Sequence, residues 1–103
     1  MELFRWRRWW SKDGLPALRV LAVEHWDPQN VYDDASRADA YDPYLERVGR
    51  MLRRGKGSEE IAHYLGLVRT KAMRLDESEA ADAIFADRVV AWYGVEAPEA
   101  PEA

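Results

Sequence analysis

Few residues of this 103-residue chain have side chains that support catalysis or metal binding: it has two histidines and no cysteine. Its most concentrated acidic stretch follows His25 and contains no glycine and no glutamate, both of which a calcium loop requires. The chain also lacks a glycine-rich phosphate loop, an HExxH helix and a serine in a nucleophile elbow. We therefore expect no catalytic residue, no metal site and no cofactor, and the chain is predicted not to be an enzyme.

The same acidic stretch carries aromatic residues, a combination that suits binding better than catalysis. Rings beside carboxylates favour a bound lysine or arginine side chain, so a basic segment of a protein partner is the predicted ligand. The competing interpretation is structural, because an aspartate before a proline can accept backbone N–H groups where the chain turns. The candidate partner-binding residues are Trp26, Asp27, Tyr41, Asp42 and Tyr44.

A second aromatic group stands in the opening segment MELFRWRRWW, where arginine and tryptophan alternate. Membrane-surface peptides and nucleic-acid stacking segments share this composition, but at about 100° per residue the apolar side chains do not fall on one face. We expect no membrane binding. The rings should instead pack on the domain or on a second copy of the chain, because exposed aromatic patches usually mark contacts. The residues expected to mediate a homodimer are Phe4, Trp6, Trp9 and Trp10.

Charge is segregated along the chain, although the net charge is only -4. From Glu24 to Asp42 there are six acids and one base, whereas from Leu45 to Arg74 there are eight bases and three acids. The overall negative charge argues against a general nucleic-acid binder, and complementarity between the two blocks is the simplest explanation.

Four helices are predicted from apolar residues that recur at three and four positions. The first begins near Pro16 and ends near His25, and the others run from Asp42 to Gly55, from Ser58 to Leu75 and from Asp76 to Gly94. Asp42, Ser58 and Asp76 are the expected N-caps. In the last helix the core residues should be Ile84, Phe85, Val89 and Trp92.

The fold class is therefore all-α: a small antiparallel four-helix arrangement with a long acidic loop between helices one and two. Residues 1–13 form an aromatic and basic segment, 14–94 the single helical domain, and 95–103 a disordered acidic tail of Pro-Glu-Ala repeats. No stretch approaches the roughly 20 apolar residues of a membrane span, and no signal peptide is recognisable. With cysteine absent, we expect a cytoplasmic protein.

One motif points to DNA instead. The segment RRGKGSEEIAHYLGLVRTKAM resembles the helix-turn-helix of response-regulator DNA-binding domains, although Val68 stands where that family has a capping serine or threonine. Unbroken helical periodicity from Ile61 to Leu75 favours a single helix. The alternative function is thus a DNA-binding module with a helix-turn-helix-like segment at 53–75. Its basic contacts would come from Arg53, Arg54, Lys56, Arg69, Lys71 and Arg74.

Several motifs in order give a longer resemblance. They are W-D-P at Trp26, Y-D-x-Y at Tyr41, then E-I-A-x-x-L and an M-x-L that ends at Leu75. Over about residues 17 to 75 the chain resembles the YugE-like family of short bacterial proteins of unknown function. This resemblance implies an all-helical fold and no known activity. The expected function is therefore a non-enzymatic protein-interaction or regulatory domain, of which an immunity-type inhibitor is one form.

Overall fold

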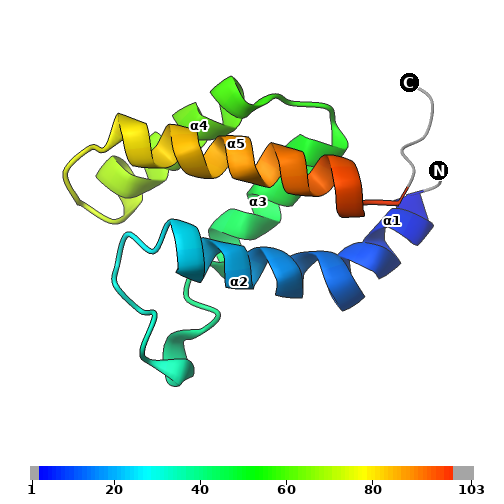
Figure 1. The fold of residues 1–103 in the computed structure, drawn as a ribbon, viewed down its shortest axis with the longest axis horizontal. Coiled ribbons are helices and arrows are strands. Elements are labelled where there is room, and N and C mark those ends of the chain that lie inside the picture. Colours follow the sequence, from blue (N-terminus) through cyan, green and yellow to red (C-terminus); the bar gives the residue numbers. More distant parts are fainter. Residues whose placement is uncertain (1–2, 99–103) are drawn as a thin grey trace.

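The computed structural model describes residues 3–98, and within them it shows helices and no strand (Figure 1). The all-α class is confirmed. The elements in chain order are α1 (Leu3–Trp9), the π turn η1 (Trp10–Gly14), α2 (Leu15–His25), the short 3₁₀ helix η2 (Ala35–Arg37), α3 (Asp42–Arg53), α4 (Ser58–Leu67), the π turn η3 (Val68–Ala72) and α5 (Glu79–Glu96).

The first helix is longer than predicted, because α1, η1 and α2 follow one another without a break from Leu3 to His25. The prediction that helix one begins near Pro16, with the opening aromatic residues outside it, is wrong. Residues of this helix are buried at every fourth position, a period that drifts by about 40° per step on a regular α-helix. Each residue of the wider π turn rotates by less than about 100°, so this turn reduces the accumulated drift. The buried row is Trp6, Trp10, Gly14, Leu18, Ala22 and Trp26.

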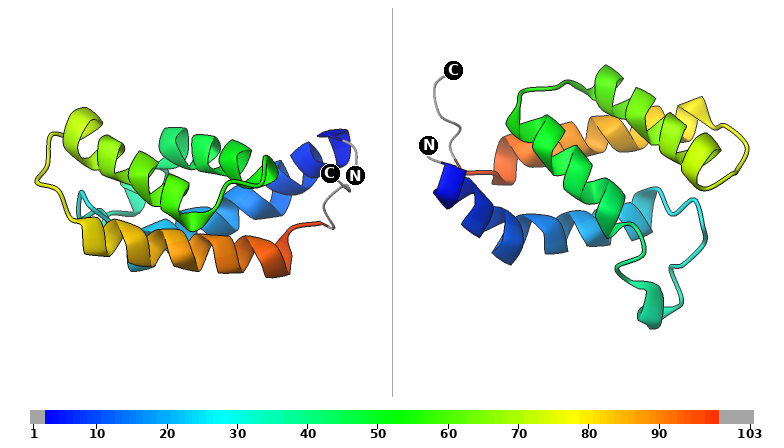
Figure 2. Two further views of the ribbon diagram at one scale, coloured as in Figure 1. Left: turned by 90° about the horizontal axis from the view of Figure 1, so that it is seen from above. Right: turned by 180° about the vertical axis from the view of Figure 1, so that it is seen from behind.

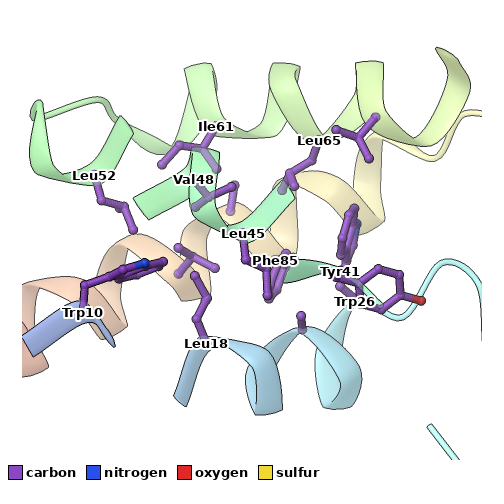
Figure 3. Packing of buried hydrophobic residues seen from close by; sticks show 14 of the residues in the cluster. Trp10, Leu18, Trp26, Tyr41, Leu45, Val48, Leu52, Ile61, Leu65 and Phe85 are labelled. Atoms are coloured by element: carbon purple, nitrogen blue, oxygen red, sulfur yellow. The ribbon is translucent and has the colours of Figure 1, made fainter. Parts of the chain in front are cut away.

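The core lies between this long helix and the other three (Figures 1 and 2). α4 and α5 lie alongside each other, while α2 packs against both α3 and α5. Side chains from every one of these helices meet in a single cluster, which Figure 3 shows from close by. The largest fully buried side chains of the cluster include Leu18, Tyr41, Leu45, Ile61, Leu65 and Phe85.

Two predicted helix ends are confirmed and three predicted caps are wrong. α2 ends at His25, and the chain turns after α3 at Gly55, whose φ of 82° suits glycine. Asp42 and Ser58 are the first residues of α3 and α4, and neither helix has a side-chain cap. α5 begins at Glu79, so Asp76 lies before it. Asp42 does not cap because its carboxylate pairs with an arginine of α2, as described below.

α5 differs from its predicted core face at Ile84. Phe85 and Val89 are fully buried as predicted and Trp92 is half-buried against the core, but Ile84 is 59% exposed. Leu75, the predicted end of the preceding helix, lies outside any helix and is 37% exposed. The helix also continues past Gly94 to Glu96, so residues 95 and 96 are not part of a disordered tail. Residues 99–103 of that expected tail lie outside the described part of the chain.

None of the helices described between residues 3 and 98 combines the length and apolar content needed to cross a membrane.

Candidate functional site

The two aspartates that precede a proline, Asp27 and Asp42, have different roles. Asp27, with a φ of 38°, accepts backbone hydrogen bonds from Val31 (2.8 Å) and Tyr32 (3.1 Å) and the hydroxyl of Tyr41 (2.7 Å). The structural interpretation of this aspartate is confirmed: it holds the start of the 26–41 segment. The carboxylate of Asp42 instead accepts two hydrogen bonds from Arg19, at 3.0 and 2.8 Å.

Tyr41 lies at the centre of this arrangement. Its side chain is 1% exposed, and its hydroxyl accepts the backbone N–H of Gln29 while donating to Asp27. Burial, and after it the hydrogen bond to Asp27, raises the pKa of Tyr41 far above that of a free tyrosine. The neutral phenol therefore links the two ends of the 26–41 segment.

Trp26 is also part of the core. Its ring is 7% exposed and stacks on Phe85, with ring centres 5.4 Å apart and planes 6° from parallel. Its Nε1 donates to Asp82 at 2.8 Å, and Asp82 also accepts from Arg69 at 2.9 Å. Of the expected partner-binding residues, therefore, Trp26 and Tyr41 are buried, Asp27 and Asp42 are already paired, and Tyr44 is half-buried.

Asp82 is the important side chain that sequence reasoning missed. It is 2% exposed, and Arg69, which pairs with it, is 8% exposed. Asp82 lies three, four and seven positions before buried Phe85, Ala86 and Val89, so helical spacing already places its carboxylate on the core face of α5. A buried carboxylate needs hydrogen bonds or a cationic partner, so this spacing predicts that Asp82 has a partner without indicating which base supplies it.

The six bases proposed for DNA do not form one surface. Arg69 is buried in an ion pair with Asp82, and the Nζ of Lys56 lies 3.5 Å from a carboxylate oxygen of Glu60. The helical chain continues through Gly66 and Leu67 into η3, without the turn that a helix-turn-helix needs there. The remaining bases divide between the two ends of α4, with Arg53 and Arg54 before it and Lys71 and Arg74 after it.

The aromatic group at the start of the chain is largely internal. Trp6 and Trp10 are 3% and 6% exposed, stack with ring centres 5.3 Å apart, and donate their indole N–H groups to Tyr93 and Glu46. Trp6 and Trp10 thus pack on their own domain, which is one of the two alternatives expected for these rings. Trp9 is half-buried, and Phe4 remains 67% exposed, with the guanidinium of Arg8 5.1 Å from its ring centre.

A groove of about 540 Å³ lies between α2 and the 26–41 segment. Two large apolar side chains in it face solvent, Val20 (53% exposed) and Tyr32 (69% exposed). Neither residue was among those expected from the sequence to bind a partner. The lining is completed by Arg19, Val23, Glu24, Val31, Asp34, Ala35 and Ala38.

The rim of this groove is acidic. The side chain of Glu24 is 61% exposed, and Asp34, which also lines the groove, is exposed as well. Asp34 also accepts the backbone N–H and the hydroxyl of Ser36 and so caps the start of η2. Arg19, the base in the lining, is neutralised by its pair with Asp42. An apolar floor under a negative rim is thus the main chemical feature of this surface.

A second hollow, which has a titratable side chain, is a candidate metal site. It has a volume of about 480 Å³, lies between α4 and α5 and includes His63, but no group of three metal-binding side chains occurs between residues 3 and 98. No family model, curated protein or solved structure matches the chain. The YugE-like resemblance therefore rests on its motifs and stays a prediction.

Proposed function

We propose that this chain is a non-enzymatic protein-interaction domain that binds a basic, apolar helical segment of a partner in the groove between α2 and the 26–41 segment. The proposal includes the finer interpretations made from the sequence: an antiparallel four-helix arrangement, an acidic loop between its first two helices, and a regulatory role in the cytoplasm. The observation that carries it is the exposure of Val20 and Tyr32 inside an acidic rim.

Apolar area supports binding at this groove. Large side chains that stay in water on a folded domain mark contact surfaces when they gather, and the volume of the groove falls within the usual range for ligand sites. One wall is the exposed face of α2, along which a second helix can lie with its own apolar face inward.

Charge supports a basic partner. Glu24 and Asp34 line the groove and are exposed, and complementary charges on a partner would both speed its association and orient it. The paired Arg19 and Asp42 contribute no net charge to the rim. An acidic segment would meet like charges here, so basic and acidic partners of equal hydrophobicity should differ in affinity.

The test uses a fluorescent helical peptide with leucines on one face and arginines on the other, followed by anisotropy. A version with glutamates in place of arginines is the peptide control. Val20→Asp should weaken binding at least about tenfold. Val95→Asp, a matched change at a side chain 79% exposed on α5, should leave it unchanged.

Glu24→Lys should also weaken binding, while Glu96→Lys, which changes charge equally on α5, should not. Equal binding by both groove variants and their controls would overturn the proposal, as would equal affinity for the two peptides. Binding of duplex DNA with a steep salt dependence, unaffected by Val20→Asp, would favour the DNA-binding alternative instead.

A further inference from the structure

The outer face of the long helix from Leu3 to His25 has an unusual pattern. Opposite the row buried at every fourth position runs a second row, displaced by two residues, whose members are exposed or half-exposed. Phe4 near its start and Val20 near its end are 67% and 53% exposed. The outer row is Phe4, Arg8, Lys12, Pro16, Val20 and Glu24.

The two ends of this row have complementary chemistry. At one end the ring of Phe4 projects from α1 with the Arg8 guanidinium over it, and Arg5 and Arg7 are exposed beside it. At the other end Val20 forms part of the apolar floor of the acidic groove. The sixteen positions between Phe4 and Val20 correspond to about 24 Å along a helix.

We propose that the groove is occupied by α1 of a second copy of this chain, in a two-fold pairing of the long helices running antiparallel. The inference rests on the proposed function, since it names the partner of the same groove. α1 has the chemistry which that groove requires: an exposed apolar ring among arginines on a short helix. One two-fold axis would fill both grooves at once, leaving no unmatched end for further growth.

The outer row also fixes how the two long helices would be aligned. If Phe4 of one copy lies against Val20 of the other, the middle of the row, at Lys12, lies near the axis, and Asp13 is placed to meet Lys12 of the partner copy. Arg8, whose side chain extends back over Phe4, then approaches Glu24.

The shape of the molecule allows this pairing. The 26–41 segment projects past the end of α2 on the side away from α4 and α5, in the front view and in the view from behind (Figures 1 and 2). In a two-fold pair this projection would flank α1 of the other copy. Trp6 and Trp10 take no part, because they are buried in their own domain. Phe4 is the one residue of the originally expected dimer contact that this pairing uses.

Sedimentation equilibrium on the full chain is the first test. We expect reversible dimers, with Phe4→Ser weakening association at least about tenfold and Val95→Ser leaving it unchanged. Arg8→Glu and Glu24→Arg should each weaken the dimer, and the double variant should regain much of the loss, because it restores opposite charges across the pair. A monomer at all concentrations would overturn the inference.

Geometry is tested by cross-linking, which is simple because the chain has no cysteine of its own. Lys12→Cys, near the predicted axis, should form a disulfide-linked dimer on mild oxidation, and Asp87→Cys, exposed on α5, should not. Dimers that form without a Lys12→Cys link would refute the antiparallel register. If the basic peptide binds to the groove but the chain stays monomeric, the proposed function stands and only this inference fails.

Discussion

The buried pair between Arg69 and Asp82 gives the sharpest prediction about stability. Asp82→Ala removes the charge partner of Arg69, a residue that is 8% exposed, and the acceptor of the Trp26 indole N–H. Breaking a buried ion pair on one side typically destabilises by about 3–5 kcal/mol, because the remaining charge is left without compensation. A domain of this size has a total stability of about 5–15 kcal/mol, so the variant should lose a large part of it.

Urea unfolding followed by tryptophan fluorescence measures this loss. The matched control is Lys56→Ala, which breaks a pair whose side chains are 43% and 60% exposed and should change stability by about 0.3–0.5 kcal/mol. Replacing Arg69 by methionine together with Asp82 by leucine should recover much of the loss. The unpaired Trp26 N–H would still cost about 1–3 kcal/mol. Equal midpoints for Asp82→Ala and Lys56→Ala would refute the reasoning.

Three further predictions concern packing, titration and pairing. Gly49→Ala should destabilise by about 1–3 kcal/mol in thermal melting, because the added Cβ would stand 2.6 Å from the Trp10 ring; an unchanged melting temperature would show that the indole moves freely. Since burial raises the pKa of Tyr41, its neutral form stabilises the fold fully below about pH 10 and that contribution is lost as pH rises further; Tyr41→Phe should reduce the alkaline fall in the urea midpoint. Asp42→Ala and Arg19→Ala should each lower stability by up to about 1 kcal/mol, less at high salt, and the double variant should lose no more than one of them; additive losses would exclude the pair as the cause.

The sequence predicted helix ends and core positions correctly where the apolar periodicity and the chain-breaking residues agree. Apolar spacing predicted helices ending at His25 and near Gly55, and the core positions Phe85 and Val89, because a regular α-helix repeats these contacts every three or four residues. It failed at the first helix, whose buried row follows a four-residue period through a π turn and therefore looks irregular when tested at 100° per residue.

The candidate site could be located only approximately, for a different reason. Asp42 has the right type and position for an N-cap, and nothing local reveals that Arg19, distant in sequence, competes for its carboxylate. Trp26 and Tyr41 were selected for their aromatic character, but tertiary packing buries them and leaves Tyr32 in the groove. Composition identifies which segment carries binding chemistry, whereas exposure depends on contacts made elsewhere in the chain.

The π turn between α1 and α2 has a consequence at the level of the gene. Loss of one codon between Trp6 and Leu18 would leave an uninterrupted reading frame, and the π turn would revert to regular α-helix. The eleven remaining steps of about 100° each would bring Trp6 to within about 20° of the side of the helix on which Leu18 lies, so its indole would stay on the core face. Among relatives of this protein, this stretch should therefore also occur one residue shorter, with an α turn in place of the π turn.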